Sequence, residues 1–74
     1  MTEKRTVYIT RATVELYKVL KFENLASSGG EAKHMIADGL VRVNGQIETR
    51  KRKQIFPGDV IEFYDITLDV CMEK

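Results

Sequence analysis

The sequence is poor in the residues that staple a small protein together or anchor it in a membrane. It contains one cysteine, Cys71, among 74 residues, so no disulfide can form within the chain. A small domain without disulfides is typical of a reducing compartment, and the charged start MTEKRTVYIT lacks the apolar segment of an export signal. No apolar run approaches the roughly 20 residues that cross a bilayer. These absences predict a cytoplasmic protein that does not associate with membranes.

The residues needed for catalysis or metal binding are also scarce. His34 is the only histidine, and together with Cys71 it falls short of the roughly four Cys and His ligands of a structural zinc site. No nucleophile or carboxylate partner for His34 is recognisable, which favours an ordinary surface or boundary histidine. The glycine-rich stretch SSGGEAK matches neither G-x-x-x-x-G-K-[ST] nor G-x-G-x-x-G, the phosphate-loop patterns. We therefore expect no catalytic residues, no metal and no cofactor.

Hydrophobic periodicity predicts one α+β domain over residues 1–74, with two helices and four or five short strands. Apolar and polar residues alternate over 5–10 and again in the last third of the chain, as in strands with one buried face. Over 13–26 the apolar residues instead repeat at i, i+3 and i+4, the spacing of one helical face. Thr13 can cap the start of this helix. The tetrapeptide FPGD, at 56–59, has the proline and glycine that a type II turn requires.

A second, shorter helix is predicted over 29–38. Ser28 and Glu31 have the Ser-x-x-Glu spacing of a capping box, and Gly39 stands where a helix needs a left-handed terminating residue. The pair Gly29-Gly30 lowers helix propensity in the first turn. Two explanations for this pair are open. Either another backbone or a ligand approaches the glycines closely, or the start of the helix is flexible.

The stretch LVRVNGQIE predicts a β-hairpin. A two-residue loop at Asn44-Gly45 would place Arg42 opposite Ile47 and mix the two faces. A three-residue loop over 43–45 would place Val41 opposite Ile47 and keep apolar side chains on one face. We expect the three-residue loop for that reason.

Positive charge is concentrated in one short segment of a nearly neutral chain. The net charge of +1 divides into +1 for residues 1–40, +4 for 41–54 and −4 for 55–74. Four consecutive cations, Arg50 to Lys53, lie within the stretch TRKRKQ. A solvated run of charge is the ordinary interpretation, but four adjacent like charges repel one another unless something offsets them. A segregation of this kind can attract a polyanion locally without making the chain basic overall.

Several residues outside the run could extend it into one anion-binding surface. The start of the second helix exposes backbone N–H groups that favour anions, and Lys33 lies in its first turns. The hairpin contributes Arg42. The predicted contact residues are Ser28, Gly29, Gly30, Lys33, Arg42, Arg50, Lys51, Arg52 and Lys53. The six aromatic residues do not interleave with the basic run, so the sequence predicts phosphate contacts rather than a platform for base stacking.

The motifs together resemble the RNA-binding domain named after small-subunit ribosomal protein four, whose core is called the αL motif. The stretch LASSGGEAKHMIADGLVRVNG, followed by the basic segment and by PGDVIEF, matches its Ser-rich turn, short second helix, V-x-V-N-G and G-D-x-I. The resemblance covers residues 14–63. SGGEAK and ETRKRK look like a small stand-alone bacterial subfamily. Many members carry an arginine where this chain has Gly29.

The resemblance implies a two-helix αL motif packed on a small, mostly antiparallel sheet. It also implies binding of structured RNA, often ribosomal or transfer RNA. We expect a non-catalytic monomer with the ribosome or its precursors among its partners, and a role in ribosome assembly, translation or RNA decay. Two other functions are open at this point. The basic hairpin could dock on an acidic protein partner, or the chain could be an accessory subunit of an RNA-modifying enzyme.

Overall fold

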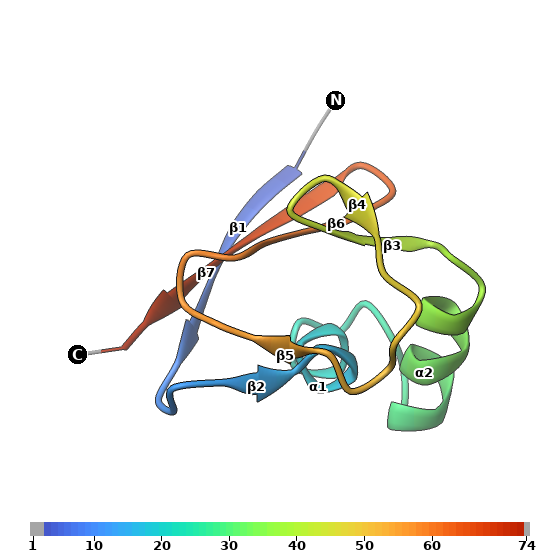
Figure 1. Cartoon of the computed structure of the whole chain (residues 1–74), viewed down its shortest axis with the longest axis horizontal. Helices are drawn as coiled ribbons and strands as arrows, with labels where there is room; N and C mark the ends of the chain where they lie inside the picture. The colour runs from blue at the N-terminus through green and yellow to red at the C-terminus, as the bar shows by residue number, and fades with distance from the viewer. Residues whose placement is uncertain (1–2, 74) are drawn as a thin grey trace.

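The computed structural model describes residues 3–73, so residues 1, 2 and 74 of the predicted domain lie outside the described part. Within that range two strands are followed by two consecutive helices and then by five more strands (Figure 1). In order they are β1 (Glu3–Ile9), β2 (Val14–Glu15), α1 (Leu16–Phe22), α2 (Gly29–Ala37), β3 (Val41–Val43), β4 (Gln46–Ile47), β5 (Gln54–Ile55), β6 (Val60–Phe63) and β7 (Ile66–Met72).

Five strands form a mixed sheet in the order β1-β7-β6-β3-β4, and both helices lie on one side of it (Figure 1). β1 and β7 come from the two ends of the chain and pair in parallel, with Val7 opposite Val70. The other neighbours in this sheet are antiparallel. The predicted α+β class, with two helices on a mostly antiparallel sheet, is confirmed. The remaining strands, β2 and β5, form a separate two-stranded sheet that the sequence did not predict.

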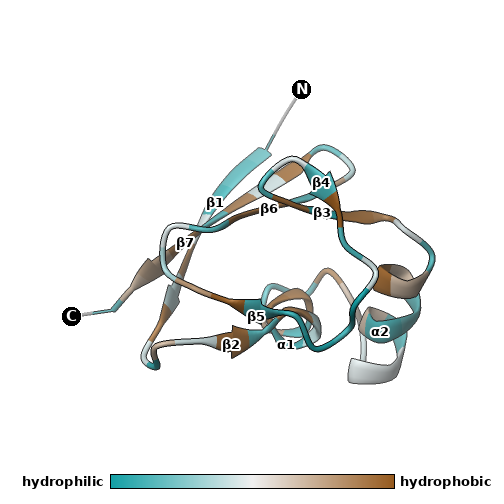
Figure 2. Ribbon diagram, in the orientation of Figure 1, coloured by the Kyte–Doolittle hydropathy of each residue, from teal (hydrophilic) through white to brown (hydrophobic). Residues whose placement is uncertain are grey.

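One apolar core joins the sheet to both helices. Leu16, Val19 and Leu20 of α1, which have the predicted helical spacing, are fully buried, as is Ile36 of α2. Alternate residues of the strands complete the core, and every buried side chain in the described range is apolar. The ribbon coloured by hydropathy shows apolar stretches on both helices and on the strands (Figure 2). The helices are therefore fixed to the sheet by burial of one face each.

α1 begins later than predicted, and Thr13 does not cap it. Val14 and Glu15 pair with β5 instead, and the helix starts at Leu16. Glu15 occupies the N-cap position without a capping hydrogen bond from its side chain. The first two N–H groups of the helix donate to backbone carbonyls of the 50–53 segment, described below. A tertiary contact thus replaces the local cap that the sequence pattern predicted.

α2 begins and ends as its capping residues predict. The Ser28 hydroxyl accepts a hydrogen bond from the Glu31 N–H at 3.1 Å, and the Glu31 carboxylate accepts bonds from the N–H and hydroxyl of Ser27, both at 3.0 Å. Gly39, with a φ of +77°, follows the C-cap residue and donates its N–H to the Ile36 carbonyl at 3.0 Å. A left-handed residue at this place ends the helix and turns the chain into β3.

The β3–β4 hairpin has the two-residue loop, so the prediction of a three-residue loop was wrong. Arg42 lies opposite Ile47. Asn44 and Gly45 have φ values of 53° and 85°, and positive φ at both central residues is the mark of a type I′ turn. The prediction assumed that β4 has a buried face. β4 is instead a short edge strand, and Ile47 is 60% exposed, so burial does not impose the register.

Asn44 also joins the hairpin to the predicted turn before β6. Its Nδ2 donates to Asp59 Oδ1 at 3.1 Å, and its Oδ1 accepts from the Val60 N–H at 2.9 Å. The type II turn is consistent with the bond from the Asp59 N–H to the Phe56 carbonyl at 3.0 Å and with the φ of +97° at Gly58. The V-x-V-N-G and G-D motifs therefore meet in space as one structural unit.

Candidate functional site

The basic segment, residues 50–53, is held by its backbone against the start of α1. The Leu16 N–H donates to the Lys53 carbonyl at 2.9 Å, and the Tyr17 N–H donates to the Lys51 carbonyl at 3.2 Å. The Lys53 N–H donates to the Arg50 carbonyl at 3.2 Å and closes a turn within the segment. Carbonyl oxygens facing the positive end of the helix dipole are favourably placed. The loop is thus anchored through its main chain, which leaves the charged side chains available for other contacts.

Tyr17 connects this segment to the first turns of α2. Its N–H binds the basic segment, while a Cβ atom at Gly29 would lie 3.6 Å from Cε2 of its ring. The Lys33 ammonium lies over the same ring, 4.6 Å from the centroid, in the geometry of a cation–π contact. The neighbour of Gly29 is therefore an aromatic side chain at ordinary contact distance, whereas a Cβ at Gly30 would meet only the Ser28 hydroxyl, at 3.9 Å. The basic segment and the start of α2 lie side by side, on the two sides of Tyr17.

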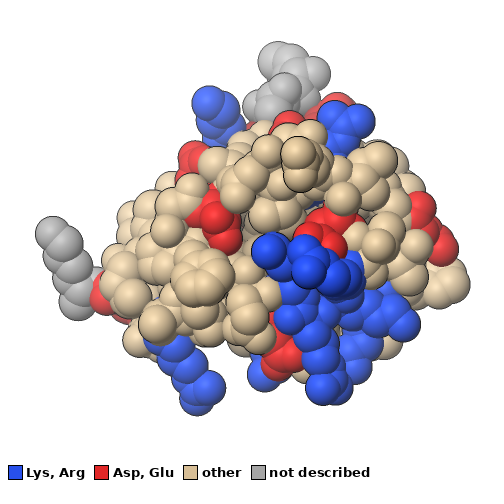
Figure 3. Space-filling model, in the orientation of Figure 1, with Lys and Arg blue, Asp and Glu red and all other residues tan. Residues whose placement is uncertain are grey.

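Positive side chains gather on this part of the surface. Figure 3 shows Lys and Arg concentrated where the connection from β4 to β5 passes α1 and α2. We define the basic patch as Lys18, Lys33, Arg50, Lys51, Arg52 and Lys53. Two carboxylates lie within it, Glu15 and Glu48. Six cations against two anions leave a strongly positive surface on a molecule whose net charge is only +1.

Glu15 holds two cations of the patch together. Its Oε1 lies 3.2 Å from Lys18 Nζ, and its Oε2 lies 3.6 Å from Arg52 Nε. Lys18 was not among the predicted contact residues. The i, i+3 spacing of Glu15 and Lys18 was visible in the sequence, but only the fold shows that the pair adjoins the basic segment. The patch therefore includes α1 as well as α2 and the loop.

Glu48 forms a two-bond ion pair with Arg50. Arg50 Nε donates to Glu48 Oε2 at 2.9 Å, and its second guanidinium nitrogen donates to Oε1 at 3.0 Å. The Arg50 N–H also donates to Oε2, at 3.0 Å. These bonds lower the pKa of Glu48 from its ordinary 4.5 to about 2, the guanidinium contact being the largest cause. Arg50 is thus fixed in direction, and a phosphate would compete with Glu48 for it.

Arg42 lies apart from the basic patch. Val41 and Val43 on either side of it are buried in the core, so the pleat of β3 directs Arg42 to the opposite face of the sheet. Its cross-strand neighbours there are Glu62 and Ile47. The structure therefore does not bring Arg42 together with Lys33, contrary to the single surface expected from the sequence.

Ser28, Gly29 and Gly30 lie at the start of α2, where Gly29 is next to the Tyr17 ring. The Ser28 hydroxyl is occupied as the helix cap, and the Glu31 carboxylate also lies at this end of the helix. A carboxylate at this position already interacts with the positive end of the dipole. Any anion bound here would rely chiefly on the two glycine N–H groups and on Lys33.

Neither a metal centre nor a membrane span is found in the part of the chain that the structure describes. Residues 3–73 contain no group of three or more His, Cys, Asp or Glu side chains able to hold a metal ion. The exposed His34 contacts Asp38, with 3.3 Å between Nε2 and Oδ2, which is an ordinary i, i+4 pair on a helix surface. Neither of the described helices is long and apolar enough to cross a membrane.

Comparison with known proteins agrees with this architecture. YbcJ of Escherichia coli strain K12 is 48% identical over 50 residues, which are 68% of this chain and 71% of that protein. YbcJ of Shigella flexneri matches to the same extent. The solution structure of Escherichia coli YbcJ has a TM-score of 0.71, with 38% identity, over 96% of this chain and 91% of that one. It is described as revealing an αL motif involved in RNA binding.

A more distant structural neighbour is the 30S ribosomal protein S4e of Thermoplasma acidophilum. The TM-score is 0.64 at 27% identity, over 78% of this chain and 31% of that one. The model of the S4 domain matches residues 7–71, nearly all of the described range. The fold, the range matched by the S4 domain model and the sequence identity to YbcJ all indicate the same family. The chain belongs to the S4 domain family.

Proposed function

We propose that this protein is a non-catalytic RNA-binding protein that holds the phosphate backbone of a structured RNA with the basic patch. The observation that carries the proposal is the arrangement around Tyr17, where six cations from α1, α2 and the 50–53 segment converge on one surface. The αL motif described in YbcJ as involved in RNA binding supports it. The patch presents charge without an aromatic platform among its six residues, which suits recognition of a folded or double-stranded RNA by its shape.

Binding of this kind is strongly dependent on salt. If about four phosphates are neutralised, the affinity falls about a hundredfold between 50 and 200 mM salt, because each contact releases condensed counterions. An affinity that stays constant across this range would exclude the phosphate mechanism.

Replacing Arg50, Lys51, Arg52 and Lys53 together by alanine is the direct test. We expect the RNA affinity to fall by one to two orders of magnitude at low salt, with a shallower salt dependence. The fold should persist with reduced stability, because the loop is anchored through its backbone but Glu48 loses its ion-pair partner Arg50. Fluorescence anisotropy with a labelled hairpin RNA measures the affinity, and thermal unfolding measures the stability of the fold.

The matched control removes cations outside the patch. A variant with Lys4, Lys21 and Arg42 replaced by alanine loses three exposed charges but leaves the patch intact. We expect its affinity for RNA to fall far less than that of the patch variant. An equal loss per charge in the two variants would mean that net charge, and not this surface, governs binding. Arg42→Ala alone tests whether the outer face of β3 contributes to binding.

The RNA target that we propose is ribosomal or transfer RNA, bound by a monomer in the cytoplasm. The structural likeness to a 30S ribosomal protein supports this class of target. Sequencing RNA crosslinked to the protein in cells would identify the target. Recovery of acidic protein partners that resist RNase treatment would instead favour a protein-docking function. Gel filtration with and without RNA would establish the oligomeric state.

A further inference from the structure

A hollow of about 570 Å³ lies beside α1, on the side facing the connection between β1 and β2. Its volume falls in the range of about 300–1,000 Å³ that is usual for small-ligand sites. The residues that matter for its chemistry are Arg11, Thr13, Glu15, Lys18, Phe22 and Gln54. The proposed phosphate contacts do not account for this hollow.

The hollow and the basic patch share a rim. Lys18 belongs to both, and Glu15, which holds Lys18 and Arg52, lines the hollow as well. Gln54 pairs with Glu15 across the small β2–β5 sheet and directly follows the basic segment. A polymer whose phosphates lie on the patch would therefore have its next unit at the mouth of the hollow.

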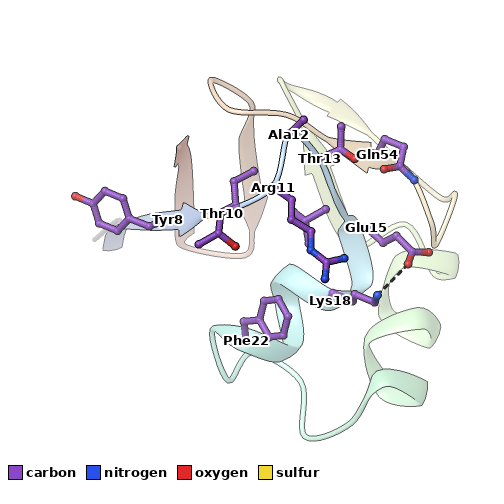
Figure 4. Close-up of a pocket in the computed structure, with 11 residues that line it drawn as sticks. Tyr8, Thr10, Arg11, Ala12, Thr13, Glu15, Lys18, Phe22 and Gln54 are labelled. Atoms are coloured by element: carbon purple, nitrogen blue, oxygen red, sulfur yellow. Dashed lines mark ion pairs between the residues drawn. The ribbon is translucent and has the colours of Figure 1, made fainter. Parts of the chain in front are cut away.

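The side chains inside the hollow suit a flat, polar, aromatic group. Phe22 is 62% exposed, although it is aromatic and lies on the last turn of a helix, and its ring projects into the hollow (Figure 4). Arg11 extends into the same space, whereas the Tyr8 ring points away from it. Bases that are splayed out of a folded RNA typically stack on aromatic rings and on guanidinium planes. Thr13 and Gln54 add hydroxyl and amide groups able to bond the edge of a base.

We propose that the hollow receives one unpaired nucleobase of the RNA whose backbone lies on the basic patch. The base stacks on Phe22, while Arg11 and Lys18 face the phosphates on either side of it. This inference rests on the proposed function and deepens it, because it names an unpaired nucleotide beside a helical stem as the feature that is recognised. The positive rim, continuous with the patch, favours a nucleotide over an apolar peptide.

The test uses two hairpin RNAs with the same stem, of which one carries a single bulged nucleotide. We expect the protein to bind the bulged RNA about 5- to 150-fold more tightly, the range that stacking of one base on an aromatic residue supplies. Phe22→Ala should abolish this preference and leave binding to the fully paired RNA unchanged. Phe56→Ala is the matched control, because Phe56 is 50% exposed and does not line the hollow.

A second readout does not depend on affinity. The chain contains no tryptophan, so Phe22→Trp introduces a single indole into the hollow. We expect its fluorescence to be quenched on titration with the bulged RNA and to change little with the paired RNA. Equal binding of both RNAs by the unaltered protein, with no difference in quenching, would overturn the inference while leaving the proposed function intact. If alanine at residues 50–53 weakens the binding of neither RNA, the proposed function fails, and this inference fails with it.

Discussion

At the scale of single residues, Tyr17 has the largest share in organising the candidate site. Its backbone N–H donates to the basic segment, and its ring lies next to Gly29 at the start of α2 and under the Lys33 ammonium. Tyr17 is not one of the six cations of the patch, so its contribution to RNA binding would come from positioning. A search of the sequence for cations passes over such a residue.

Tyr17→Ala should therefore weaken RNA binding although it removes no charge. We expect a loss of about two- to fivefold, because the ring that positions Lys33 through a cation–π contact worth roughly 0.5–1 kcal/mol is removed, whereas the backbone N–H that holds the basic segment is kept. Anisotropy titrations measure this loss. Tyr17→Phe keeps the ring and should bind as the unaltered protein does. A loss of affinity in Tyr17→Phe as large as that in Tyr17→Ala would assign the effect to the hydroxyl instead.

Glu48 gives the protein a pH-dependent contribution to stability. Its side chain is only 13% exposed, and its pKa in the folded state is lowered to about 2, chiefly by Arg50. A carboxylate whose pKa is lower in the folded than in the unfolded state stabilises the fold at pH values above its unfolded-state pKa. This stabilisation disappears as the pH falls to the folded-state pKa. Glu48→Gln should thus be less stable than the unaltered protein at pH 7, with the difference vanishing between about pH 4.5 and pH 2. Urea unfolding at several pH values measures this.

The same substitution should act in the opposite direction on RNA binding. Glu48→Gln frees Arg50 from its ion pair and removes one negative charge from the patch. We expect tighter binding at low salt and a salt dependence steeper by about one phosphate contact. Unchanged binding would indicate that Arg50 does not face the RNA.

At the scale of elements, the cap of α2 separates a structural from a functional role for Ser28. Its hydroxyl accepts the Glu31 N–H, so Ser28→Ala should lower the free energy of unfolding by about 0.5–2 kcal/mol. RNA affinity measured well below the unfolding transition should change little if capping is its only role. Thermal unfolding and anisotropy on the same sample distinguish the two roles. A large loss of affinity with unchanged stability would assign Ser28 to the RNA contact predicted from the sequence.

Elements with strong local signals were predictable, and those fixed by tertiary contacts were not. The capping box and Gly39 gave the limits of α2 because those residues act on their own backbone. The start of α1 depends on backbone carbonyls more than 30 positions away in the chain. The prediction that Thr13 caps the helix used only local sequence and was therefore wrong. The predicted register of β4 was wrong because the prediction assumed that one face of this strand is buried, whereas β4 is an exposed edge strand.

Some features of the candidate site were likewise predictable from the sequence, and others depend on the fold. The concentration of cations over 50–53 was visible in the sequence, and the structure places Lys33 beside it. The separation of Arg42 depends on the buried face of β3, and the inclusion of Lys18 depends on the packing of α1 against the loop. Which residues share a surface is a property of the fold, and charge patterning alone does not provide it.

At the scale of the whole molecule, stability rests on one core. Ile36 is fully buried and belongs to the cluster that joins both helices to the sheet. Ile36→Ala should lower the free energy of unfolding by about 2–5 kcal/mol, a large share of the roughly 5–15 kcal/mol that is typical of a domain. Chemical denaturation followed by circular dichroism measures the change. A loss below about 1 kcal/mol would contradict a single, tightly packed core.

The parallel pairing of β1 with β7 also has a consequence for biosynthesis. Val7 and Val70 are neighbours in the sheet but 63 positions apart in the chain. At about 5–20 residues per second, a nascent polypeptide waits about 3–13 seconds between making the first of these residues and the last. During that interval β1 has no partner strand, and an unpaired strand is a template for association with other chains. The parallel pairing that closes this edge of the sheet therefore cannot form until β7 has been synthesised.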